Sequence, residues 1–329
     1  MKTTFRFIPV LVRYSLIAAA AEKQYSLPIA RLTIKSIDEQ LVPVSGVKIH
    51  LVFMEPDTRK PLSTYGQTDD EGLYSAEGGS DSDMAGEIMK AGYYNGGFPF
   101  QPFREAKEGR WQPWNQTNVA LMRKIENPIP MYARILNVKV PAQGKACGYD
   151  LKEGDWVSPW GKGLVPDLVF TVKYDYTNFN HYDLSMKLGF SNPLDGIQPA
   201  NPPEEYAHGE FIWHRQAPES GYLPSFEQEK GLPSKLYQIP SAPGIRHLED
   251  VGKLKCYFRV RTVEKDGRIV SALYGKLAAG FEMGISSQRE VKVVLNYYLN
   301  PTPLDRNMEF DLKQNLFKNL KFDEQSRKP

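Results

Sequence analysis

The fold of the N-terminal half is decided by the run Val44-Ser45-Gly46-Val47-Lys48-Ile49-His50-Leu51, by Thr68-Asp69-Asp70-Glu71-Gly72-Leu73-Tyr74 and by Lys90-Ala91-Gly92-Tyr93-Tyr94. In the first run, and on to residue 53, apolar positions alternate with Lys48, His50 and Val52. This period of two is typical of a strand with one buried face. The second run contains a turn, because aspartates bond their own backbone and glycine accepts a positive φ. The three runs therefore predict strand, turn, strand, loop and strand.

This pattern resembles the carboxypeptidase regulatory-like domain, a small transthyretin-like β-sandwich that is common in bacterial extracytoplasmic proteins. The resemblance implies a scaffold that brings no catalytic residues with it. We therefore expect the function to depend on surfaces and loops added to this scaffold.

Length and composition limit the possible number of domains, fold classes and partners. A chain of 329 residues is long enough for about two domains. An aromatic content of 12%, with 18 tyrosines, favours β-structure. The 25 prolines and 26 glycines are spread along the chain, as expected for many short strands joined by turns. The formal net charge of +2 argues against nucleic acid as the main partner.

Residues 1–21 are predicted to be a secretory signal peptide. Lys2 and Arg6 give a positive start, and Ala19-Ala20-Ala21 supplies small residues for cleavage. Arg13 interrupts the apolar stretch, so an ordinary first strand or helix stays open as the alternative. The signal predicts a periplasmic or secreted protein with no transmembrane anchor after cleavage, since no other segment approaches the length of a membrane helix.

The rest of the chain is predicted to form two all-β domains. Residues 29–126 form the regulatory-like sandwich, and the break Asn127-Pro128-Ile129-Pro130 ends it. Residues 131–312 form a larger β-sandwich-like domain, and residues 313–329 form a polar tail, of which Lys318 to Pro329 is expected to be loosely held. Residues 191–245 form a long irregular excursion between strands, and such long loops are usually functional or mobile.

The clearest hairpin of the second domain turns at Asp266-Gly267. Alternation in its first strand predicts that Leu254, Cys256, Phe258 and Val260 face inward. The opposite face then carries a basic stripe, which is expected to be solvated and consists of Lys253, Lys255, Tyr257, Arg259 and Arg261.

Beyond the first domain, the chain resembles a family of uncharacterised exported bacterial proteins. Three stretches carry this resemblance: residues 127–133, residues 154–163 and residues 296–307, which read NPIPMYA, GDWVSPWGKG and NYYLNPTPLDRN. The resemblance implies no activity.

Aromatic clusters are the most informative candidate sites. Rigid rings beside polar groups can stack on sugars or on partner side chains. The alternative is that they close the ends of the sandwiches, because tryptophan is usually largely buried. The candidate ligand-binding residues are Trp111, Trp114, Trp156, Trp160, Tyr93 and Tyr94.

The two cysteines, Cys147 and Cys256, permit one disulfide in an exported protein, with two buried free thiols as the alternative. No nucleophile elbow, histidine pair or cysteine pair at metal-ligand spacing occurs in the sequence. We therefore predict no catalytic residues, no metal and no cofactor.

Taken together, these features predict an all-β, two-domain protein that is a non-enzymatic binding or structural module of the cell envelope or extracellular space. Its partners would be an envelope protein or a polysaccharide. The competing hypothesis is a carbohydrate-active hydrolase whose site is built from the loops of residues 191–247, which would require two converging carboxylates.

Overall fold

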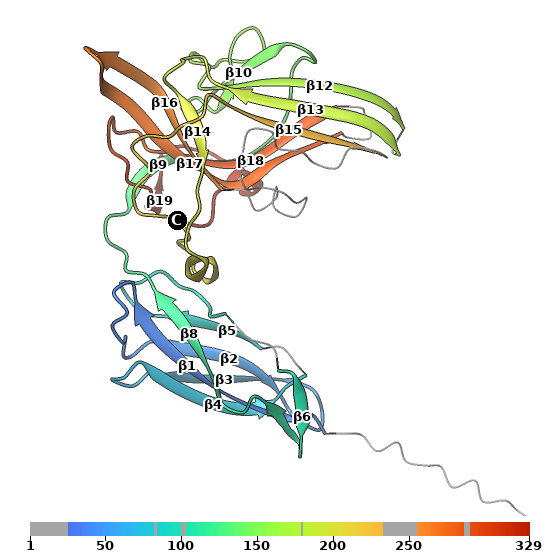
Figure 1. Ribbon diagram of the computed structural model, residues 1–329, viewed down its shortest axis with the longest axis vertical. Coiled ribbons are helices and arrows are strands. Elements are labelled where there is room, and N and C mark those ends of the chain that lie inside the picture. The colour runs from blue at the N-terminus through green and yellow to red at the C-terminus, as the bar shows by residue number, and fades with distance from the viewer. Residues whose placement is uncertain (1–25, 82–83, 100–102, 179, 233–254, 286–289) are drawn as a thin grey trace, which may run out of the picture.

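The structure is a computed structural model that describes residues 26–81, 84–99, 103–178, 180–232, 255–285 and 290–329 (Figure 1). Strands dominate these residues, so the all-β prediction is confirmed. Within them, helical geometry is confined to two short 3-10 turns, η1 (Glu204–His208) and η2 (Phe322–Glu324). No helix in the described ranges has the length and apolar character needed to cross a bilayer. The predicted signal peptide lies outside the described residues.

The first domain contains eight strands: β1 (Ile29–Asp38), β2 (Lys48–Met54), β3 (Pro61–Gln67), β4 (Leu73–Gly79), β5 (Ala85–Met89), β6 (Glu105–Lys107), β7 (Arg110–Gln112) and β8 (Gln116–Met122). They form two layers. One layer is β3–β2–β5, and the other contains β4, β1 and β8. In the described part of the first domain, strand pairing joins the two layers at Met54↔Gly79, and a cluster of buried apolar residues from both layers fills the space between them.

The predicted turn at residues 69–72 connects strands as the sequence implied. The carboxylate of Asp69 accepts hydrogen bonds from the backbone N–H groups of Glu71 at 3.0 Å and Leu73 at 2.8 Å. Gly72 has φ +75°, and a Cβ at this position would lie 2.5 Å from the carbonyl oxygen of Ser36. Only glycine therefore fits this turn without displacing β1.

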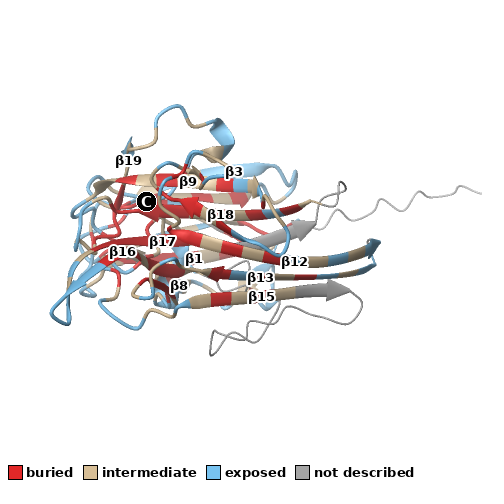
Figure 2. Cartoon of the chain, turned by 90° about the horizontal axis from the view of Figure 1, so that it is seen from above, coloured by how far each residue is buried: buried red, intermediate tan, exposed pale blue. Residues whose placement is uncertain are grey.

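The second domain contains two sheets. The five-stranded sheet consists of β11 (Asp155–Trp156), β10 (Ala146–Asp150), β12 (Leu168–Asn178), β13 (His181–Gly189) and β15 (Ser225–Leu232). The six-stranded sheet consists of β14 (Gly196–Pro199), β16 (Cys256–Lys265), β17 (Arg268–Ile285), β18 (Val291–Leu299), β9 (Ile129–Lys139) and β19 (Phe310–Asn315). One large core cluster draws residues from both sheets, and the buried stretches of β17 and β18 are visible in Figure 2.

The six-stranded sheet is covered on its second face as well, which corrects the predicted solvated stripe. Tyr257 is 1% exposed and packs with Trp213 in a separate cluster. Arg259 donates to the carbonyl oxygen of Leu194 at 2.6 Å, and Arg261 is bound to buried aspartates. The cover over Tyr257 comes from residues 200–217 of the excursion after residue 191, whereas β14 and β15 in the same excursion are strands of the two sheets. Alternation identified the strand correctly but could not show that both of its faces are buried. Lys253 and Leu254 lie outside the described residues.

The C-terminal tail is docked rather than loose. Glu324 forms an ion pair with Arg134 at 2.6 Å, and the hydroxyl of Ser326 donates to Asn296 at 2.6 Å. The Tyr298 hydroxyl donates to the carbonyl oxygen of Lys328 at 3.0 Å. The polar composition of the tail reflects these bonds to β9 and β18.

Candidate functional site

Two of the six predicted aromatic site residues belong to the interior. Trp156 is 7% exposed and packs edge-on against Tyr149 and Phe170. Tyr94 is 8% exposed and stacks on Phe211 with ring centroids 5.0 Å apart. Neither ring is available to a ligand, which corrects their assignment as binding residues. Trp160 and Tyr93 are half-buried and pack against the cores of the second and first domains, respectively.

Trp111 and Trp114 differ in their roles. Trp111 stacks on Phe103, and its indole N–H donates to the carbonyl oxygen of Ser80 at 2.8 Å. It therefore ties β7 to the residue that follows β4. Trp114 is half-buried, and the Arg110 guanidinium lies 5.0 Å from its ring centroid. Of this pair, Trp114 is the better placed to meet a partner.

Cys147 and Cys256 are free, buried thiols rather than a disulfide. They lie on β10 and β16, which belong to different sheets, and both contribute to the core cluster between those sheets. Burial raises the pKa of Cys256 to about 12 from its ordinary value of 9.0. Both cysteines therefore act as small apolar core residues.

The junction between the domains is built around Arg123, which follows β8. Its side chain is 4% exposed and pairs with Glu39 at 2.9 Å. It also donates to two carbonyl oxygens of the second domain, those of Phe211 at 2.8 Å and Trp213 at 2.6 Å. The guanidinium lies 3.8 Å from the ring centroid of Tyr206. Arg123 therefore attaches the first domain to the excursion that covers the six-stranded sheet.

Arg215 completes this network from the second domain. It pairs with Glu39 at 2.5 Å and with Glu126 at 3.3 Å, and it forms a close ion pair with Glu309. The Glu309 side chain is 2% exposed. It also accepts a hydrogen bond from the backbone N–H of Asn127 at 2.6 Å. Glu39 thus bridges an arginine of each domain, so we call Arg123, Arg215, Glu39, Glu126 and Glu309 the junction network.

A buried lysine lies next to the junction network. Lys276 on β17 is fully buried and donates to the carbonyl oxygen of Met308 at 2.6 Å. Its ammonium lies 5.3, 5.2 and 4.7 Å from the ring centroids of Phe211, Trp213 and Tyr298. Burial lowers the pKa of Lys276 well below its ordinary value. No sequence signal marks this lysine, because the residues that bury it come from distant parts of the chain.

Backbone pairing also crosses the junction. Gly97 donates to the carbonyl oxygen of His208 at 2.7 Å, and Glu210 donates to that of Asn95 at 2.9 Å. An apolar pocket of about 290 Å³ lies beside this junction and is lined by Ile37, Glu39, Leu41, Pro99, Val119, Leu121, Glu205 and Tyr206.

A second ionic cluster orders the loop of residues 151–166. The carboxylate of Asp150 accepts hydrogen bonds from four backbone N–H groups, those of Lys152, Glu153, Leu164 and Val165. Burial raises the pKa of Asp150, but these bonds outweigh it and leave the pKa below its ordinary value. Arg261 pairs with Asp150 at 2.8 Å and with Asp167 at 2.7 Å. These acids are therefore committed to holding a loop.

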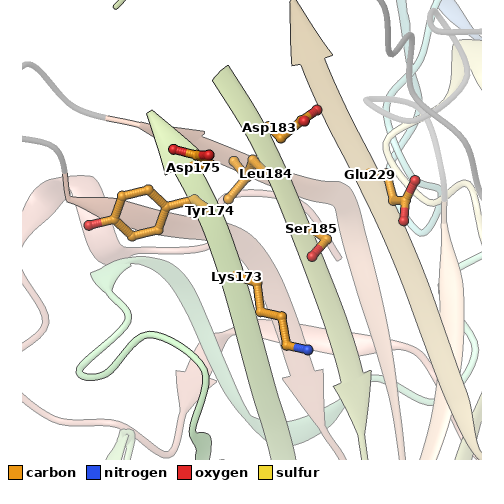
Figure 3. A pocket seen from close by; sticks show the side chains of 7 residues that line it. All are labelled: Lys173, Tyr174, Asp175, Asp183, Leu184, Ser185 and Glu229. Carbon is orange, nitrogen blue, oxygen red and sulfur yellow. The ribbon is translucent and has the colours of Figure 1, made fainter. Parts of the chain in front are cut away.

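A polar pocket opens on the outer face of the five-stranded sheet (Figure 3). It measures about 290 Å³, and its polar side chains come from three neighbouring strands: Lys173 and Asp175 on β12, Asp183 and Ser185 on β13, and Glu229 on β15. Asp175 and Asp183 are direct cross-strand partners. Such a surface can donate to and accept from the hydroxyl groups of a polar ligand.

Comparisons with known proteins add little to this description. No family model and no curated protein matches the chain. Among solved structures, the shaft pilin SpaA of Lactobacillus rhamnosus GG is 11% identical, with a TM-score of 0.18, 53% of this chain covered and 91% of that one. A streptococcal ancillary pilin is 10% identical, with a TM-score of 0.20 and coverages of 85% and 62%. A Bacteroides uniformis protein, provisionally described as carbohydrate-binding, is 14% identical, with a TM-score of 0.17 and coverages of 82% and 98%. At these TM-scores the similarities carry no argument.

Proposed function

We propose that this protein is a non-enzymatic binding or structural module of the cell envelope or extracellular space, periplasmic or secreted, which contacts protein or polysaccharide as one rigid two-domain unit. The observation that carries this proposal is the junction network. Because Glu39 bridges Arg123 and Arg215, and because backbone pairing joins residues 95–97 to residues 208–210, the faces of the two domains keep a fixed relation. A fixed relation suits a module that presents surfaces to a large partner.

The polar pocket of Figure 3 supports a binding role, because the polar groups that line it come from three neighbouring strands on one face of the sheet. In this proposal the first domain is a carboxypeptidase regulatory-like domain, which serves as a scaffold. The described part of the excursion, which the hydrolase hypothesis would use, packs as a cover through Phe211 and Trp213.

The proposal is tested by incubating the purified protein with cell envelopes of its host. We expect saturable co-sedimentation and no release of reducing sugar from the envelope polysaccharides. Absence of saturable co-sedimentation would contradict the module. Steady release of reducing sugar would favour the hydrolase, whose site would then lie among the excursion loops.

A further inference from the structure

One sheet of the first domain continues across the domain boundary. Strands β3, β2 and β5 are extended by residues 95–97 through the bridge Ile88↔Gly96. Residues 208–210 of the second domain then pair with residues 95–97 through the bridge Gly96↔Gly209. Five backbone segments from both domains therefore lie side by side. With strands about 4.8 Å apart, four spacings span about 19 Å.

The register of these segments places two rows of side chains on the outer face, because directly opposite residues of an antiparallel ladder share a face. The first row, continued in the same register, is Tyr65, His50, Glu87, Gly97 and His208. The second row is Gln67, Lys48, Met89, Asn95 and Glu210. We call these ten positions the cross-domain face.

An exposed aromatic ring lies at one end of the cross-domain face. Tyr65 is 72% exposed, and the His50 ring stacks against it with centroids 4.6 Å apart and planes 7° apart. The His50 ring is held in turn by a hydrogen bond to the Ser63 hydroxyl at 3.1 Å, and it lies 4.0 Å from a carboxylate oxygen of Glu87. The tyrosine ring is thus supported on one side and open to solvent on the other.

A polar pocket lies at the other end. It measures about 280 Å³ and is lined by Glu87, Met89, Asn95, Gly96, His208, Gly209, Glu210 and Lys328. The row position between Glu87 and His208 is Gly97, which has no side chain to fill the hollow. The pocket exists only while the domains stay joined, because its walls come from both.

We propose that the cross-domain face binds a neutral polysaccharide chain, with one sugar stacked on Tyr65 and a further sugar in the pocket between Glu87 and His208. This inference rests on the proposed function and names the ligand class. The apolar C–H face of a pyranose matches the open tyrosine ring, and its hydroxyl groups match the carboxylate, amide and hydroxyl groups along the rows. The face carries Glu87 and Glu210 against Lys48, and Lys328 in the wall of the pocket supplies the second positive charge, so formal charges over the face and its pocket balance and an uncharged ligand fits.

The polar character of the face favours a sugar chain over a protein. Protein interfaces have an apolar core with several buried aromatic residues. On the cross-domain face, Tyr65 and Met89 are instead separated by His50, Lys48 and Glu87. The span of about 19 Å, from four strand spacings, suits an extended oligomer rather than a single sugar.

The test is affinity electrophoresis in gels that contain hydroxyethyl cellulose, laminarin, xyloglucan, galactomannan or dextran. We expect the wild-type protein to be retarded by at least one of these. Tyr65→Ala should weaken binding to that polysaccharide at least tenfold, and His208→Ala at least threefold. Tyr65→Phe should retain binding, because it keeps the ring. The matched control is Phe322→Ala, which removes a ring that is 75% exposed but lies on η2, outside the face.

Each outcome separates this inference from the proposed function. Retardation that survives Tyr65→Ala and His208→Ala would overturn the cross-domain site while supporting a polysaccharide-binding module. Absence of retardation in all five gels, with envelope co-sedimentation intact, would overturn the sugar ligand and leave the protein-contacting form of the module. Loss of binding in Phe322→Ala as well as Tyr65→Ala would show a general surface effect and would also overturn the site.

Discussion

Removing the side chain of Arg215 should lower the free energy of unfolding far more than removing that of an exposed arginine. The Arg215 side chain is 19% exposed and forms ion pairs with Glu39 and Glu309. The side chain of Glu309 is only 2% exposed. Arg215→Ala leaves that buried carboxylate without its cation, which typically costs about 3–5 kcal/mol. The matched control is Arg31→Ala, whose pair with Glu77 has side chains 43% and 57% exposed and is worth about 0.2–1 kcal/mol.

The assay is urea unfolding at pH 7, followed by far-ultraviolet circular dichroism and by tryptophan fluorescence. Trp213 is part of the cluster beside the junction, so fluorescence reports on this region. We expect the free energy of unfolding to fall by about 3–5 kcal/mol in Arg215→Ala and by about 1 kcal/mol or less in Arg31→Ala. Equal, small losses of unfolding free energy in both variants would show that the junction network does not hold the domains together.

Three further predictions concern other parts of the fold. Asp150→Asn should lower stability by about 1–3 kcal/mol at pH 7, because it weakens buried hydrogen bonds. The folded pKa of Asp150 lies below its ordinary value of 3.8, so the carboxylate stabilises the fold above that value, and this stabilisation is lost as the pH falls through the folded pKa. In urea unfolding, the difference in unfolding free energy between the variant and the wild-type protein should therefore shrink in acid. A difference that stays constant with pH would contradict this prediction. Cys256 should resist a thiol reagent in the folded protein at pH 8. Above pH 9 the unfolded thiol ionises first, so this group should make the free energy of unfolding fall by up to about 1.4 kcal/mol per pH unit, and Cys256→Ala should reduce the measured slope by that amount. Trp111→Ala should lower the thermal midpoint clearly, whereas Trp114→Ala should change it little, as measured by differential scanning calorimetry; the reverse order would contradict the contacts described for them.

The sequence allowed the strands and the fold class to be predicted because each strand shows its own alternation. In the run from Val47 to Phe53 every second residue is a large apolar one, and the structure buries these residues. The turn at Asp69 and Gly72 could also be predicted, because the side-chain and backbone conformations that it requires are local.

Features that depend on distant segments could not be predicted. Tyr257 looked like part of a solvated face because nothing in β16 itself shows that Phe211 and Trp213 cover it. The burial of Lys276 leaves no local pattern either, because its aromatic neighbours come from the excursion and from β18. Glu39 and Arg215 lie 176 positions apart, so their ion pair leaves no local pattern.

The candidate binding surfaces were also predictable only where they depend on local sequence. Sequence reasoning selected aromatic residues, and structure then assigned Tyr94 and Trp156 to the interior. It missed Tyr65 and His50, whose stacking depends on the register of β2 with β3. Alternation placed His50 on the outer face, which was the available signal, but pairing across strands was needed to bring the two rings together.

A distance distribution between the two domains tests whether they form one rigid unit. Spin labels at the exposed positions of Asp70→Cys and Lys265→Cys would report from one domain each, because the native cysteines are buried. Double electron–electron resonance should give a single narrow distribution in this protein and a broad one after Arg215→Ala. A broad distribution in the protein with Arg215 intact would show instead that the two domains move relative to each other.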